Sequence, residues 1–340
     1  MQETLRTLRA CGAFVGAIRS HGDCPPALKA VADEFFRLYE LVDVEKIADR
    51  GEDPSTVDVF AIDSLLRIQN KENLRKMLAI ICRLDAHLGM ATATRERGFV
   101  FPVVADGPGR RIEVRGLYHL FLSRPVRNDF RLDEEKNLLF LTGPNMAGKS
   151  TYMKAVGIAL ILAHIGMGVP AASMTFSPID YLFCELSMHD DVRLGISGFM
   201  AEVVRIRRIL QFCTGKLRLM VIIDEVFKGT NVLDAFECSK VVINGLAGLR
   251  DHFFLISSHL VELEPEIRPN GNIRFQSFDA HARDGHLTFS YQIADGVSKT
   301  RVGARLLDEH GVTAFFQKLA RTPLSSGPQF PGGPRLSPPP

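Results

Sequence analysis

Short apolar runs and longer helical patterns alternate along the chain from residue 137 onward. The short runs predict strands, and the longer patterns between them, in which apolar residues recur every three or four positions, predict helices. The expected strands are 137–142, one near 181–186, 218–223 and 252–257, and the expected helices are about 150–165, 199–213 and 233–249. This alternation predicts an α/β fold whose mainly parallel sheet is covered by helices on its faces.

The segments on either side of this alternating region have other patterns. The first 90 residues or so are mainly helical, with apolar stripes in Ala27–Leu41 and again from Val59 to Leu88. The remaining expected elements are β-rich pieces at 99–104 and 112–114, strand-like runs at 273–278 and 287–293, and a helical end at 301–319. We therefore expect a short helical domain at 1–95, an α/β domain at 96–320 and a disordered Pro/Gly/Ser-rich tail at 321–340.

Composition narrows the class of protein only slightly. A hydrophobic content of 46% and a charged content of 24% are typical of a soluble globular protein, and a net charge of +2 neither requires nor excludes nucleic acid. The six cysteines are scattered without a C-x-x-C pair, which favours reduced thiols in a cytoplasmic protein over a zinc site. Ala155–Ala172 is apolar apart from His164, but it closely follows a glycine loop and contains Gly166, Gly168 and Pro170, so we expect a buried helix and no membrane association.

The glycine-rich segment 143–151 follows an expected strand and opens an expected helix. It fits the pattern G-x-x-x-x-G-K-[ST], and its residues are Gly143, Pro144, Asn145, Met146, Ala147, Gly148, Lys149, Ser150 and Thr151. In this context the backbone N–H groups and the helix N-terminus suit the phosphates of a nucleotide. Lys149 is expected to reach the β- and γ-phosphates, and the Ser150 hydroxyl is expected to bind Mg²⁺.

Two later strands end in polar residues that suit hydrolysis. Asp224 and Glu225 follow the strand at 218–223, and we expect Asp224 beside the metal and Glu225 orienting the attacking water. His259 follows the strand at 252–257, where it would sense the γ-phosphate. The alternative readings are a solvated turn for the two acids and a structural role for the histidine.

Ser197 precedes a helix that carries Arg205, Arg207 and Arg208. A serine at this position is usually a helix cap, but it would also suit a phosphate presented by another subunit. The arginines favour a solvated helix face more than a nucleic-acid contact.

Taken together, these segments resemble the ATPase domain of the MutS family, the mismatch-repair ATPases related to ABC-type proteins. The similarity extends over about residues 60–315, and Pro144-Asn145-Met146 is its most distinctive part. The matching residues are Leu141–Lys154, Phe176–Asp180, Ser197, Phe199, Glu202, Asp224, Glu225, Gly229, Thr230, Asn231, Asp234, Ser258, His259, Asp295–Thr300 and Gly303.

The resemblance implies a P-loop (Walker A) ATPase that binds ATP and Mg²⁺ and works as a nucleotide-sandwich homodimer. Lys149, Glu225 and His259 would act in catalysis, and Ser150 and Asp224 at the metal. Ser197, Phe199 and Glu202 would form the signature that completes the partner's site, and Asn231 and Asp234 would belong to the D-loop. The adenine contact is left open, with Val126 and Asn128 in the relevant segment.

Several positions depart from the family pattern. Ala147 and Gly198 replace the usual glycine and a common threonine, and Phe227-Lys228 replaces Gly-Arg. The 136 residues before the first ATPase strand are far fewer than a mismatch-reading domain and clamp helices require. We therefore expect a short form without the mismatch-recognition domain.

Three hypotheses about the purpose of the chain stay open. One is a DNA-associated ATPase of mismatch repair that acts on branched or mismatched DNA, with an unidentified repair or recombination partner. The second is an ATP-driven dimerisation module for a protein partner without a DNA role, and the third is a truncated, inactive relative. A phosphate-loop kinase is disfavoured, because the acids and His259 suit hydrolysis and no acceptor site is evident.

Overall fold

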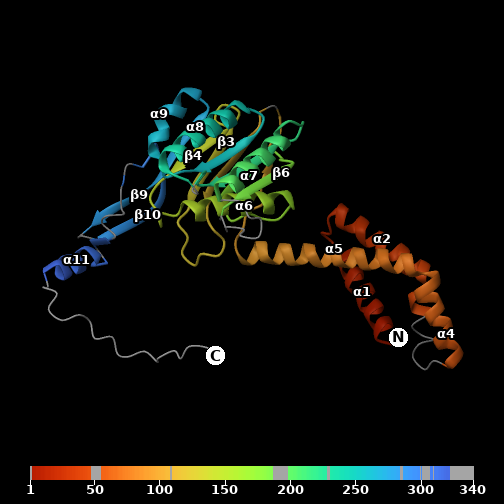
Figure 1. Cartoon of the computed structure of the whole chain (residues 1–340). Helices are drawn as coiled ribbons and strands as arrows, with labels where there is room; N and C mark the ends of the chain where they lie inside the picture. Colours follow the sequence, from red (N-terminus) through yellow and green to blue (C-terminus); the bar gives the residue numbers. More distant parts are fainter. Residues whose placement is uncertain are drawn as a thin grey trace, which may run out of the picture. The chain divides into compact units, whose positions relative to one another are not determined.

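The protein forms two compact units, Met1–Arg97 and Gly98–Pro340, in the computed structural model (Figure 1). The structure describes residues 2–46, 55–107, 109–186, 198–227, 230–283, 286–298, 300, 307–308 and 310–321. Most of the expected C-terminal tail, residues 322–340, lies outside the described residues.

The first unit is helical. Its elements are α1 (Gln2–Ser20), α2 (Pro26–Val42), α4 (Thr56–Ser64), the π-helical turn η1 (Leu65–Gln69) and α5 (Lys71–Glu96). Val15, Phe35, Ile62 and Met77 are among the side chains buried in its core. Ser55 begins α4 with a capping box, since its hydroxyl accepts from the Asp58 N–H while the Asp58 carboxylate accepts from the Ser55 N–H.

Two of the apolar stripes predicted in this unit are partly wrong in phase. Leu41 and Leu78 are exposed, and the neighbouring Val42 and Met77 are buried in their place. The helical pattern predicted from Val59 to Leu88 contains the π-helical turn η1, which the apolar periodicity did not predict.

The second unit is built on a six-stranded sheet. Its strand order is β10–β9–β4–β8–β7–β6, and all neighbouring pairs are parallel except β10 with β9. The strands are β4 (Leu138–Thr142), β6 (Tyr181–Glu185), β7 (Leu219–Asp224), β8 (Phe253–Ser257), β9 (Ile273–Arg283) and β10 (His286–Asp295). The predicted mixed α/β fold with a mainly parallel sheet is confirmed.

A second, four-stranded sheet in this unit was not predicted. It contains β1 (Val103–Val104), β2 (Arg111–Leu117), β3 (Asn128–Asp133) and β5 (Ser173–Phe176), in the order β1–β5–β2–β3. The expected β-rich pieces at 99–104 and 112–114 overlap β1 and β2, and β5 joins β2 from about 60 residues away. Non-local pairing of this kind leaves little local signal.

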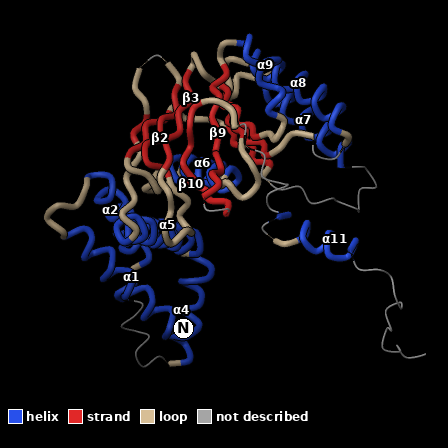
Figure 2. The backbone as a smooth tube through the Cα atoms, turned by 90° about the vertical axis from the view of Figure 1, so that its left-hand side faces the viewer, coloured by secondary structure: helices blue, strands red, loops and turns tan. Residues whose placement is uncertain are grey.

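Helices cover both faces of the six-stranded sheet. Helix α6 (Lys149–His164) packs with the four-stranded sheet against one face, where Leu139 and Leu141 of β4 lie. Helices α7 (Gly198–Cys213) and α8 (Val232–Gly248) pack against the other face, where Leu138 and Phe140 lie. Figure 2 shows α7 and α8 together with α9 (Glu264–Ile267) on one side of the strands.

The shorter elements are the 3-10 turns η3 (Val261–Leu263) and η4 (Arg268–Asn270) and the helix α11 (Val312–Arg321). The predicted helical end at 301–319 therefore corresponds in part to α11, and residues 301–306 lie outside the described residues. No helix in the described part of the chain has the length and apolar character needed to cross a membrane.

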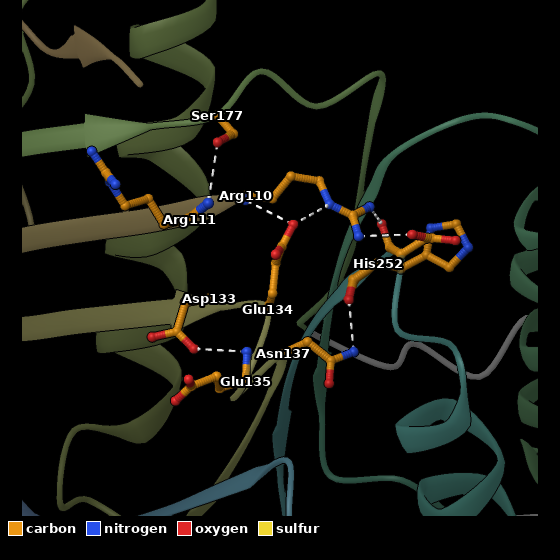
Figure 3. A network of polar contacts seen from close by, with 9 residues as sticks. Arg110, Arg111, Asp133, Glu134, Glu135, Asn137, Ser177 and His252 are labelled. Carbon is orange, nitrogen blue, oxygen red and sulfur yellow. Dashed lines mark hydrogen bonds and ion pairs between the residues drawn. The ribbon is translucent and has the colours of Figure 1, made fainter. Parts of the chain in front are cut away.

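Polar contacts join the two sheets of the second unit at the start of β4 (Figure 3). The Arg110 guanidinium donates to the Asp251 carbonyl and carboxylate at 2.8 and 2.7 Å, and the Arg110 N–H donates to Glu134. Asn137 is fully buried and donates from Nδ2 to the carbonyls of Leu249 and His252 at 3.2 and 2.9 Å. Its Oδ1 accepts from the buried Asn272 amide, so Asn137 connects the ends of three chain segments.

We expect Asn137→Ala to lower the free energy of unfolding by roughly 1–3 kcal/mol, because buried carbonyls and an amide lose their partner. Glu135→Ala is the control, since Glu135 is exposed and close in the chain. Urea unfolding followed by circular dichroism measures both variants. Equal midpoints for the two variants would contradict this role for Asn137.

Candidate nucleotide site

The glycine loop connects the end of β4 to the start of α6 through three residues with positive φ. These are Gly143 at 141°, Met146 at 67° and Gly148 at 105°. A Cβ on Gly143 would lie 2.5 Å from the Phe278 carbonyl oxygen of β9, so only glycine fits there without a shift. The neighbouring strand therefore fixes where the loop begins.

Lys149 is buried in the mouth of this loop. Its Nζ donates to the carbonyls of Gly143 and Pro144 at 2.7 and 3.2 Å, and only 4% of the residue is exposed. Ala147, which departs from the family pattern, is also buried, and its methyl group joins the core beneath the loop. The substitution for glycine is thus accommodated by packing.

Asp224 at the end of β7 accepts hydrogen bonds from two hydroxyl groups. Ser150 Oγ of α6 donates to its Oδ2 at 2.5 Å, and Ser257 Oγ of β8 donates to its Oδ1 at 2.5 Å. Ser257 Oγ in turn accepts the Glu225 N–H at 3.0 Å. The carboxylate thereby connects the loop helix to two strands.

Glu225 follows Asp224 in a left-handed conformation, with φ of 62°. Its Oε1 lies 2.5 Å from His259 Nε2, and its side chain is largely buried whereas that of His259 is partly exposed. The structure therefore brings together the two residues predicted to act on water and on the γ-phosphate.

A cavity of about 440 Å³ opens beside the loop. Its lining includes Pro144–Met146, Gly148–Tyr152 and Glu225, together with residues from the four-stranded sheet and from β10. The other lining residues include Tyr118, His119, Arg124 and Val126 of the segment between β2 and β3, Asn128 of β3 and Tyr291 of β10. Burial and the nearby Lys154 charge lower the pKa of His119, which favours the neutral form of its imidazole.

Among the described residues, those assigned to the signature and the D-loop do not line the 440 Å³ cavity. Glu202 is buried and lines a cavity of about 30 Å³ with Asp224 and Glu225, and Phe199 packs against Phe227 with ring centroids 5.4 Å apart. Asn231 caps α8, since its Oδ1 accepts the Asp234 N–H at 2.9 Å. Ser197, Gly229 and Gly303 lie outside the described residues.

Four residues of the site escaped the sequence reasoning. Ser257 pairs in register with Asp224 and with Leu141, so neighbouring parallel strands that end at one edge would have indicated it. Tyr291 lies about 140 residues after the loop in an unremarkable strand pattern, and no sequence signal pointed to it. The upstream aromatic residues Tyr118 and His119 were passed over in the same way.

Comparison with known proteins agrees with the resemblance seen in the motifs. The family model for MutS domain V matches residues 139–322, which is more than half of the chain. The DNA mismatch repair protein MutS of Geobacillus thermodenitrificans (strain NG80-2) is 30% identical over 314 residues, covering 88% of this chain and 33% of that protein. The protein of the same name from Lactococcus lactis subsp. cremoris (strain MG1363) is 25% identical over 311 residues, covering 86% of this chain and 36% of that protein.

The fold and site define a mixed α/β protein with a phosphate-loop pattern at the carboxyl edge of a parallel sheet. The chain belongs to the MutS family and contains its domain V. It spans about a third of the length of the curated relatives that it matches.

We expect Gly143→Ala to destabilise the protein by roughly 3 kcal/mol or more, because the methyl group meets the Phe278 carbonyl and the positive φ is strained. Gly166→Ala is the matched control. It also has a positive φ, but its added methyl group would meet nothing within 4 Å, so we expect a loss of about 1–2 kcal/mol. Thermal unfolding of both variants would refute the steric argument if their losses were equal.

Proposed function

We propose that the chain binds Mg²⁺–ATP in the cavity beside the glycine loop and hydrolyses it. The observation that carries this proposal is the convergence of Lys149, Ser150, Asp224 and Glu225 at the carboxyl edge of one parallel sheet. Open α/β sheets bind ligands at this edge. The phosphate loop, the acids and the cavity support a P-loop ATPase domain of ABC type.

Lys149 and the backbone N–H groups of residues 143–151 would hold the phosphates. Lys149 already faces the loop carbonyls, so its ammonium would exchange those contacts for phosphate oxygens. The N-terminus of α6 adds positive potential at the same point. Binding therefore requires little movement of the loop helix.

The oxygen atoms of Ser150 and Asp224 fit Mg²⁺. This cation prefers oxygen ligands and is usually held by one or two protein groups plus phosphates and water. Ser150 Oγ and Asp224 Oδ2 lie 2.5 Å apart, so the two protein oxygen ligands are already close together. When bound, the ion would neutralise charge on the phosphates, while Ser257 keeps the Asp224 carboxylate in position.

Glu225 would orient the attacking water and accept its proton, and His259 would hold the Glu225 carboxylate and respond to the γ-phosphate. The contact between Glu225 Oε1 and His259 Nε2 supports these two roles. Tyr118, His119, Val126 and Tyr291 would surround the base, because they line the same cavity as the glycine loop.

A second subunit would complete the nucleotide site. By resemblance to the family, Ser197, Phe199 and Glu202 of one subunit would contact the nucleotide held by the other, with Asn231 and Asp234 at the interface. The printed name of the relatives, DNA mismatch repair protein MutS, supports action at DNA as the role of this ATPase. A protein partner without DNA is the competing role.

We expect Glu225→Gln to retain ATP binding and to slow hydrolysis by on the order of 10²–10³, because the group that orients water loses its charge. With ATP and Mg²⁺ the variant is expected to elute from a sizing column as a dimer, whereas the parent protein hydrolyses ATP and returns to the monomer. Lys149→Ala is the control that prevents nucleotide binding. An ATP-bound Glu225→Gln variant that stays monomeric would refute the sandwich arrangement.

We also expect duplex or branched DNA to stimulate ATP turnover by the intact chain. The measurement is steady-state phosphate release with and without DNA at low salt, where contacts to DNA phosphates are strongest. A rate of phosphate release that no DNA changes would refute the DNA role. A stable protein complex that survives nuclease treatment would then favour the protein-interaction module.

A further inference from the structure

Tyr291 has a strained backbone inside a bulge of β10. Its φ is 55°, in the left-handed region that a tyrosine rarely adopts. Phe289 and Ile293 pair with Ala280 and Phe278, so three residues of β10 lie opposite one residue of β9. Strain of this kind persists only where surrounding contacts hold it.

The side chain of Asn128 supplies such contacts. Its Nδ2 donates to the Tyr291 carbonyl at 2.9 Å, and its Oδ1 accepts the Ile293 N–H at 2.8 Å. Asn128 is buried at the start of β3, so both ends of its amide are used on the bulge of a distant strand. The amide replaces ladder hydrogen bonds that the bulge disrupts.

The bulge places the Tyr291 ring against the glycine loop. A Cβ on Gly148 would lie 3.3 Å from Tyr291 Cδ1, so the ring borders the loop where α6 begins. The residue is 45% exposed and lines the 440 Å³ cavity. An exposed aromatic face at the edge of a cavity suits a flat ligand group.

We propose that Asn128 is a positioning residue that holds Tyr291 as a wall for the base of the bound nucleotide. This inference rests on the proposed function, because the cavity must accept a nucleotide. Fixing the ring in advance reduces the conformational freedom lost on binding. Asn128 therefore acts on affinity for the base, and the phosphate chemistry at Lys149 and Glu225 proceeds without it.

The test compares Asn128→Ala, Tyr291→Ala and the double variant in the full chain. For Mg²⁺–ATP we expect Tyr291→Ala to raise Kd and KM by about three- to tenfold. Asn128→Ala should do nearly the same, and the double variant should be no worse than Tyr291→Ala. In each variant kcat should stay within about twofold of the parent, and the affinity for inorganic triphosphate with Mg²⁺ should be unchanged, because triphosphate has no base.

Three further variants make the result specific. Gln292→Ala changes an exposed side chain of the same bulge and should leave Kd unchanged. Tyr291→Phe keeps the ring and should bind ATP like the parent. Asn128→Asp keeps the acceptor for the Ile293 N–H but loses the donor, so an intermediate Kd is expected, and this variant preserves the test if Asn128→Ala does not fold.

Two outcomes would overturn the inference. Additive losses in the double variant would mean that Asn128 contacts the nucleotide independently of Tyr291. Equal losses for ATP and inorganic triphosphate would mean that Asn128 supports the loop and not the base. A parent protein that binds neither ligand would instead refute the proposed function, so the two failures are distinguishable.

Discussion

The carboxylate of Asp224 is the contact on which the rest of the site depends. It accepts the hydroxyl of Ser150 from the loop helix and that of Ser257 from the neighbouring strand, and Ser257 also holds the backbone of Glu225. Because both oxygens of the carboxylate are used, its orientation is fixed. The start of α6 and the ends of β7 and β8 are thereby brought to one point, beside a carboxylate–imidazole pair formed by Glu225 and His259.

Close packing places the loop relative to that point. The Phe278 carbonyl of β9 leaves no room for a side chain on Gly143, and the Tyr291 ring of β10 lies against Gly148. The C-terminal hairpin therefore borders both ends of a loop that precedes it by more than a hundred residues. The polar contacts of Asn137 and Arg110 lie at the opposite edge of the sheet, just before β4, β8 and β9 begin (Figure 3).

Local patterns were sufficient for the parallel sheet and its helices. The apolar runs before Gly143, Asp224 and His259 became β4, β7 and β8 because buried strands need continuous apolar residues on both faces. The four-stranded sheet was not predicted as a unit, although the expected β-rich pieces at 99–104 and 112–114 overlap β1 and β2, because β5 pairs with both strands from about 60 to 70 residues away. The helical stripes of the first unit are shifted by one residue at Leu41 and Leu78, where the neighbouring Val42 and Met77 are buried.

The sequence by itself determined the family, the order of the motifs and the phosphate-loop pattern, because these depend on residues close together in the chain. Only the tertiary structure decided that Ser257 holds Asp224, that His259 pairs with Glu225, and that Tyr118, His119 and Tyr291 surround one cavity. Each of these contacts joins segments from different strands. Their geometry follows from strand register and from a bulge in β10, and neither is encoded in any short stretch of residues.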